Sequence, residues 1–166
     1  MNRYRYVEPE EFEDFYRESR DVCFRAISVS VKNADLAYEL LSASFERCLK
    51  NWPQVSTHPN KNGWVVTTAL NIYKDNLRKE KNRRKFLFFS GHSYEQHTDA
   101  IDSKLLQRIR SLPEQQRYVI AYRIILDLSV ETTATLMELS PSTVSVHLSR
   151  ALDTLKDQLN VQDWRK

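Results

Sequence analysis

The chain has 166 residues and a formal net charge of +3; 41% of its residues are hydrophobic and 28% are charged. This length and composition fit one or two small globular domains and exclude a disordered chain. Two glycines against five prolines favour α-helices over a β-protein with many tight turns. The sequence has neither an 18-residue apolar run nor a signal-peptide hydrophobic segment, which predicts a cytoplasmic protein that does not insert into a membrane.

The positive charge is concentrated in one segment. Residues 61–89 hold 8 Lys or Arg against only Asp75 and Glu80, a net charge of +6, whereas residues 1–60 and 90–166 carry −2 and −1. A basic segment of this kind either binds a polyanion or forms a solvated helix face. Charge alone leaves both interpretations open.

Apolar side chains at intervals of three and four residues predict a first helix from about Pro9 to the break at residues 31–33. Asn33 is predicted to cap a second helix, whose apolar pattern begins at Leu36 and ends at Trp52, before Pro53. The exposed face of this second helix, including Ala43, is solvated surface by default. The side chains of both helices that are predicted to form a core are Phe12, Phe15, Ile27, Leu40, Phe45 and Leu49.

Residues 53–63 have the composition of a loop. A third helix is predicted from about Trp64 to about Arg84. Basic and amide side chains lie on one of its faces at steps of 3, 4 and 3 residues: Asn71, Lys74, Arg78 and Lys81. Because this helix carries most of the basic segment, that face is the candidate site for a nucleic acid.

Residues 86–100 interrupt the helical periodicity and are predicted to form a linker. The amphipathic pattern resumes at Ile101. Ser111 and Glu114, with Pro113 between them, have the spacing of a capping box and predict the start of a further helix.

Residues 129–152 predict a helix-turn-helix, in which a short helix, a tight turn and a longer helix follow each other. Ser129 is predicted to cap the first helix, and Ser140, followed by Pro141, to cap the second. The inward positions are Val130, Ala134, Leu139, Val144 and Leu148. The outward positions of the second helix, which can bond phosphates and base edges, are Ser142, Thr143, Ser145, His147, Ser149 and Arg150. A plain helical hairpin is the alternative, favoured by a net charge of −2 over residues 112–159.

The whole chain resembles the extracytoplasmic-function sigma factors, the smallest group of the sigma-70 family. In the C-terminal half the resemblance lies in Leu112-Pro113 with Arg117, in residues 140–144 and in residues 148–151. In the N-terminal half, residues 37–41 with Phe45 resemble region 2.2. The residues that resemble regions 2.3 and 2.4 are Trp64, Ala69, Asn71, Asp75, Arg78, Arg83 and Arg84.

This resemblance implies an all-α protein with two small helical domains. Residues 1–85 are expected to form a region 2-like domain that binds core polymerase and the −10 element. Residues 86–100 form the linker, and residues 101–166 a region 4-like helix-turn-helix domain that binds the −35 element. The expected function is that of an alternative sigma factor, whose partners are promoter DNA and the clamp and flap of core RNA polymerase. An anti-sigma factor is a further partner that the resemblance leaves open.

Three sets of site residues follow from matching this sequence to the family's motifs. The residues expected to bind the −10 element are Trp64, Asn71, Lys74, Arg78, Lys81, Arg83 and Arg84. Those expected to bind the −35 element are Ser142, Thr143, Ser145, His147 and Arg150. Those expected to bind core polymerase are Glu39, Ser42, Phe45 and Glu46. The loop at residues 53–63 corresponds to the family loop that holds a base flipped from the non-template strand.

The sequence departs from the family at four positions: Ser42 replaces a glutamine, Glu138 a glycine, and Ser145 and His147 basic residues. These departures support an alternative, a degenerate sigma-like DNA-binding regulator or interaction protein that does not itself drive initiation. A stand-alone helix-turn-helix repressor is a third possibility, which the long N-terminal part fits poorly. No catalytic set, cofactor motif or metal-ligand spacing stands out, so we expect neither an enzyme nor a cofactor or metal site.

Overall fold

The structure, a computed structural model, describes residues 9–82 and 102–163. Every regular element in those two ranges is helical, which confirms the all-α prediction. The elements of the N-terminal half are α1 (Pro9–Ser30), α2 (Ala34–Lys50), α3 (Trp52–Val55) and α4 (Lys61–Asn82). Those of the C-terminal half are α5 (Ser103–Ser111), α6 (Glu114–Val119), the π-helix η1 (Ile120–Ile125), α7 (Val130–Met137) and α8 (Pro141–Asp163).

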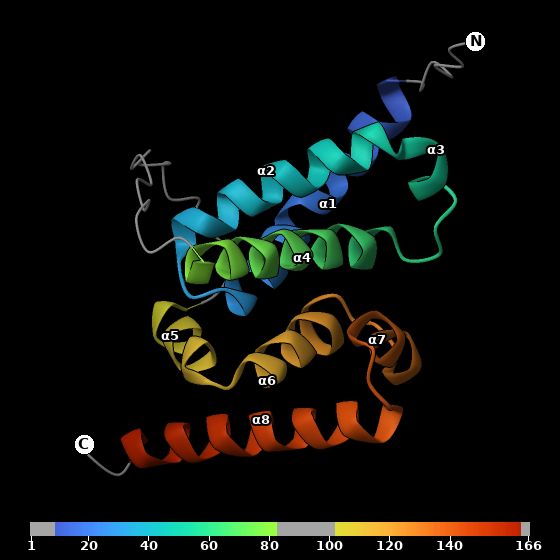
Figure 1. The fold of residues 1–166 in the computed structure, drawn as a ribbon. Helices are drawn as coiled ribbons and strands as arrows, with labels where there is room; N and C mark the ends of the chain where they lie inside the picture. The colour runs from blue at the N-terminus through green and yellow to red at the C-terminus, as the bar shows by residue number, and fades with distance from the viewer. Residues whose placement is uncertain (1–8, 83–101, 164–166) are drawn as a thin grey trace.

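The N-terminal half begins with two helices whose boundary agrees with the prediction. Asn33 caps α2, since its side-chain oxygen accepts a hydrogen bond of 2.9 Å from the backbone N–H of Asp35. Helices α1 and α2 both contact α4, and Figure 1 shows these three helices together. Four aromatic rings pack together at the end of this bundle where α1 and α3 begin: Phe12, Phe15, Phe45 and Trp52.

Two details of the N-terminal half differ from the prediction. The segment expected to be a loop contains the short helix α3, with Pro53 in its first turn, and α4 begins three residues before Trp64. A proline is accepted in the first turn of a helix because its missing N–H would have no partner there. Leu49, expected in the core, is 45% exposed, because it lies on the outer side of α2.

The C-terminal half contains the predicted helix-turn-helix. The Ser129 hydroxyl accepts a bond of 3.0 Å from the Thr132 N–H at the start of α7, which confirms that cap. The Ser140 hydroxyl accepts one of 3.2 Å from the Thr143 N–H at the start of α8, which confirms the second. All five predicted inward side chains lie in one apolar cluster, in which Val119 also packs.

The capping box expected at residues 111–114 is wrong. Pro113 occupies the N-cap position of α6, without a side-chain capping bond, and Ser111 ends the preceding helix. The Ser111 hydroxyl donates to the Arg108 carbonyl at 2.7 Å, so it bonds backward along α5 instead of forward to α6. Serine commonly bonds a carbonyl of the preceding turn in this way.

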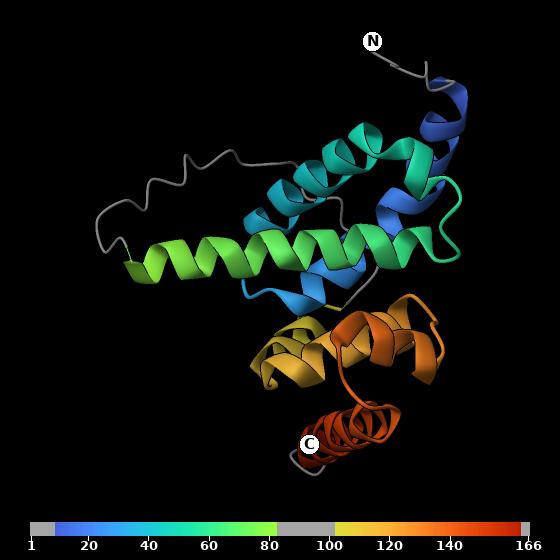
Figure 2. The same ribbon diagram turned by 45° about the vertical axis from the view of Figure 1, so that its right-hand side comes forward.

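The two halves pack against each other around the C-terminal part of α1. Residues 26–31 are buried without exception, and α1 contacts α2 and α4 as well as α5, α6 and η1. One hydrophobic cluster therefore contains both Val29 of α1 and Ala121 of η1. Figures 1 and 2 show the resulting order, with α1, α2 and α4 in one layer, α5 to α7 in the next, and α8 outermost.

Among the helices of residues 9–82 and 102–163, none is both long and apolar enough to cross a membrane. The predicted linker at residues 86–100 lies outside the described residues.

Candidate nucleic-acid and polymerase interfaces

The predicted −10 face lies along α4. Asn71, Arg78 and Lys81 are exposed, and Lys74 is half-buried. The Arg78 guanidinium lies 3.7 Å from the Asp75 carboxylate, but both side chains are solvent-exposed, so water screens this pair and leaves the arginine available to a phosphate. Four donor side chains on consecutive turns of one helix suit a polyanionic strand. Arg83 and Arg84 lie outside the described residues.

Trp64 lies in the first turn of α4, beside the short connection that leaves α3. Its side chain is half-buried and packs on the core cluster, and its backbone N–H bonds the Asn60 carbonyl at 3.0 Å. Within the connection, the His58 ring nitrogen Nδ1 accepts a bond of 3.0 Å from the Asn60 N–H. These local hydrogen bonds fix the conformation of the connection between α3 and α4, which is part of the segment expected to hold a flipped base.

The predicted −35 face lies on the N-terminal part of α8. Ser142, Ser145 and Arg150 are exposed, whereas Thr143 and His147 are half-buried. Val144, which lies between Thr143 and Ser145 in the sequence, is fully buried. It anchors the other side of α8 in the core, so the predicted −35 face points away from the core. The Thr143 hydroxyl lies 2.7 Å from the Ser140 hydroxyl, so part of its hydrogen-bonding capacity is used within the helix cap.

The turn between α7 and α8 forms without the glycine that the family has there. Glu138 takes up the left-handed conformation, with φ 56° and ψ 41°. The turn is closed by bonds from the Glu138 N–H to the Thr135 carbonyl at 3.3 Å and from the Leu139 N–H to the Ala134 carbonyl at 3.0 Å. A side chain other than glycine pays about 1 kcal/mol for this conformation.

The predicted polymerase face lies on α2, where Glu39, Ser42 and Glu46 are exposed. A hydrogen bond of 2.7 Å from Lys50, together with the charge of that lysine, lowers the pKa of Glu46. Phe45 was predicted both in the core and in the polymerase face, and the structure confirms the core position. Only 3% of Phe45 is exposed, and its ring lies 4.9 Å from that of Tyr16 and 5.9 Å from that of Phe15. Phe45 therefore supports α2 from inside, and its side chain is not available to a partner.

The fold does not bring the three predicted faces together. Figure 1 shows the layer of α5 to α7 between α4 and α8, so the two DNA faces lie in different layers. Helix α2 lies on the side of the N-terminal half that faces away from α8 in both ribbon views. Each face is therefore a separate surface.

Sequence reasoning missed the polar contacts between the two halves. Arg110 donates from Nε to the Ser28 carbonyl at 3.0 Å, and Arg117 donates from Nε to the Ser30 carbonyl at 3.1 Å. Arg117 is only 4% exposed and also donates to the Leu112 carbonyl at 2.7 Å. The sequence offered one signal: the family motif includes Arg117, but it does not show the partner of that side chain.

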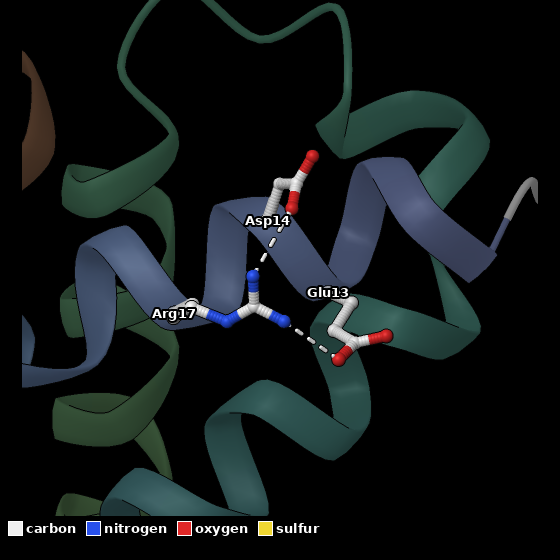
Figure 3. A network of polar contacts seen from close by, with 3 residues as sticks. All are labelled: Glu13, Asp14 and Arg17. Atoms are coloured by element: carbon white, nitrogen blue, oxygen red, sulfur yellow. Dashed lines mark hydrogen bonds and ion pairs between the residues drawn. The ribbon is translucent and has the colours of Figure 1, made fainter.

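The outer face of α1 is acidic and does not belong to any of these sites. Figure 3 shows Arg17 between Glu13 and Asp14, with the closest nitrogen-to-oxygen distances at 2.8 and 3.6 Å. All three side chains are about two-thirds exposed, so these pairs contribute little to stability.

Comparison with known proteins agrees with this geometry. Residues 102–155 match the family described as Sigma-70, region 4. RNA polymerase sigma factor SigV of Bacillus subtilis is 28% identical over 80% of this chain and 81% of its own length. The RNA polymerase sigma-E factor of Streptomyces avermitilis is 25% identical over 92% of this chain and 87% of its own length.

Among solved structures, the sigma factor RpoE of Bartonella quintana, in complex with the anti-sigma factor NepR, has the same fold. The TM-score is 0.75, with 16% identity, over 92% of this chain and 98% of that one. The region 4 match, the two relatives and this fold agree with the motifs of both halves. Residues 102–155 thus match sigma-70 region 4, and the chain as a whole is similar to RNA polymerase sigma factors, in agreement with the extracytoplasmic-function group that its motifs resemble.

Proposed function

We propose that this protein is an alternative sigma factor that binds core RNA polymerase and directs it to specific promoters. The observation that carries the proposal is the pairing, on one chain, of an exposed basic face on α4 with a helix-turn-helix that matches sigma-70 region 4. In this proposal the protein acts by binding rather than by catalysis. We propose a cytoplasmic location as well, because its proposed partners, polymerase and promoter DNA, are found there.

In the N-terminal half, α2 would bind the polymerase clamp through Glu39, Ser42 and Glu46. Helix α4 would bind the −10 element, with Asn71, Lys74, Arg78 and Lys81 contacting the backbone of the opened strand and Trp64 offering a ring on which a base can stack. Arg83 and Arg84 continue this basic sequence. The exposure of Arg78 and Lys81 supports the phosphate contacts.

In the C-terminal half, α8 would enter the major groove of the −35 element. Ser142, Thr143, Ser145, His147 and Arg150 supply the hydroxyl, imidazole and guanidinium groups for phosphates and base edges. The acidic charge of this half predicts weak binding on its own. Attachment to polymerase, both through α2 and through the flap, raises the effective concentration of α8 at the promoter and offsets that weakness.

Run-off transcription with purified chain, bacterial core polymerase and genomic promoter fragments tests the proposal, with a pull-down of core in parallel. We expect core binding and a discrete start site. Exchange of Arg78 for glutamine should reduce the transcript, whereas exchange of Arg17, which lies on the acidic outer face of α1, should not.

Two other outcomes have distinct meanings. Core binding without any transcript would favour a degenerate, inhibitory sigma-like protein, the alternative that Ser42, Ser145 and His147 support. Absence of core binding with polymerase from the native source would contradict the proposal. An anti-sigma partner, such as that named for the Bartonella quintana relative, is proposed here on that likeness of fold alone.

A further inference from the structure

A cavity of about 120 Å³ lies between α4 and the connection from α1 to α2, and we call it the α4 cavity. Its lining is mostly apolar and includes Tyr73 and Leu77 of α4 and Leu36 of α2. Tyr73 is buried and Leu36 is half-buried, but 38% of Leu77 is exposed to solvent. An apolar cavity of about 150 Å³ in another protein binds benzene. The size and lining of the α4 cavity therefore suit one aromatic ring.

The α4 cavity lies on the side of α4 that faces away from the predicted −10 face. A helix has roughly 3.6 residues per turn, so Tyr73 and Glu80 of the cavity lie about half a turn around α4 from Asn71 and Arg78 of that face. A group bound in the cavity would therefore leave the −10 face free.

A candidate occupant follows α4 in the sequence. Residues 86–89, Phe-Leu-Phe-Phe, are four consecutive apolar residues and lie outside the described residues. Helix α4 ends at Asn82, and Leu77 lies about 7.5 Å back from that end, at about 1.5 Å per residue. Four extended residues span about 13 Å, so the chain after Asn82 is long enough to reverse and bring Phe86 to Leu77.

The other segments outside the described residues fit this cavity less well. Residues 1–8 precede Pro9, whereas the cavity is lined by Lys32, which lies beyond the opposite end of α1. Helix α1 has 22 residues and is therefore about 33 Å long, but eight extended residues span at most about 29 Å. Residues 164–166 follow α8, which is in the outermost layer (Figure 1). Reach and composition together favour residues 86–89.

We propose that an aromatic side chain of residues 86–89 occupies the α4 cavity and that this contact holds the start of the linker against α4. Burial of the ring beside Leu36, Tyr73 and Leu77 removes apolar surface of both partners from water, which is the main driving force for such a contact. Because the segment belongs to the same chain and follows α4 closely, its effective concentration at the cavity is high.

The contact has a consequence for the −10 site, and this consequence rests on the proposed function. Arg83 and Arg84 lie between α4 and residues 86–89 in the sequence. A contact that fixes the chain on both sides of these two arginines would keep them near the end of the basic face of α4. The free energy needed to order them when DNA binds would then be smaller.

The first experiment measures the cleavage of the full chain by chymotrypsin, with each cleaved bond assigned by mass spectrometry. Cleavage at residues 86–89 requires molecules in which the segment is released, so its rate follows the released fraction. Leu77→Gln removes an apolar wall of the cavity and should speed this cleavage several-fold. Cleavage after Tyr94, which lies in the same linker beyond the segment, should keep its rate and is the internal control.

Leu152→Gln is the matched control variant, because Leu152 is 46% exposed on α8 and lies far from the cavity in sequence. It should leave every rate unchanged. Leu36→Gln alters the opposite wall and replaces Leu77→Gln if that variant loses its helical circular dichroism. Unchanged cleavage at residues 86–89 in the folded cavity variants would overturn the proposal. Protection that rises with protein concentration would place the segment on a second copy of the chain and would overturn it as well.

The second experiment measures binding of a fluorescent 12-nucleotide DNA strand of mixed sequence at low salt. Leu77→Gln should weaken binding several-fold, although Leu77 is not part of the −10 face, because Arg83 and Arg84 are then released together with the linker. Leu152→Gln should bind as the unchanged chain does. Equal binding by a variant with a released segment would contradict the consequence for the arginines. Polymerase is absent from both experiments, so a failure of transcription would refute the proposed function without altering the cleavage result.

Discussion

At the scale of single residues, Glu138 is the clearest case of a backbone conformation that does not suit its side chain. Its φ of 56° lies in the left-handed region, where the side chain of any residue but glycine is strained. We expect Glu138→Gly to raise the free energy of unfolding by about 0.5–1 kcal/mol, measured by urea denaturation. Glu131→Gly, at an exposed position inside α7, is the control and should lower it by a similar amount. A loss of stability at both positions would contradict the role given to the turn.

Arg117 is a second residue with a specific energetic role. Its buried guanidinium donates to the Ser30 and Leu112 carbonyls, so Arg117→Met should leave two buried acceptors without their donor. We expect a loss of about 2–4 kcal/mol in the free energy of unfolding. Arg20→Met removes an arginine that is about half exposed and should cost less than about 0.5 kcal/mol. Equal effects of the two changes would show that the bonds of Arg117 contribute nothing specific.

At the scale of elements, α4 is predicted to bind a strand through phosphate contacts, which makes its affinity depend on salt. Arg78→Gln with Lys81→Gln should weaken binding of single-stranded DNA and reduce the slope of log K against log salt by about 1.4, since each phosphate contact on a single strand contributes about 0.7. Arg17→Gln with Arg20→Gln removes the same charge from α1 and should leave the slope unchanged. A slope that changes equally in both pairs would indicate a general effect of net charge.

Most elements could be predicted from the sequence because their signals are local. Asn33, Ser129 and Ser140 cap helices whose apolar side chains recur with the helical period, and each cap bonds an N–H within three residues. The errors have local causes too. The Ser111 hydroxyl had a competing acceptor in its own helix, and Pro53 is compatible with both a loop and the first turn of a helix. Sequence spacing does not decide between such alternatives.

At the scale of the whole molecule, the sequence did not predict that the two halves share a core. The reason lies in residues 26–31 of the chain, where small and apolar side chains occur on every side of α1. Periodicity identifies a helix with one apolar face and one polar face, but it does not identify the second partner of a helix that is buried all round. That partner, η1, comes some 90 residues later in the chain. For Phe45 the helical periodicity predicted the core position that the structure shows, whereas the family motif marks a position without stating which way its side chain points.

The shared burial of thiols and phenols makes the stability of the whole molecule sensitive to alkaline pH. Burial raises the thiol pKa from the ordinary 9.0 to about 12 for Cys23 and about 11 for Cys48, and raises the phenol pKa of Tyr122 from 10.0 to about 12. Between pH 9 and 11 these groups therefore ionise in the unfolded chain and stay protonated in the folded one. The folded state then binds more protons, so the free energy of unfolding must fall as pH rises.

Each group that is ionised only in the unfolded chain contributes a slope of about 1.4 kcal/mol per pH unit. We expect urea denaturation to show stability that is steady between pH 7 and 8 and falls progressively above pH 9. Cys23→Ala with Cys48→Ala will change the stability at every pH, but it should also make the alkaline slope shallower by up to about two protons, because two of the titrating groups are gone. An unchanged slope would mean that the thiols are not protonated selectively in the folded state, and would place the alkaline sensitivity on the buried tyrosines instead.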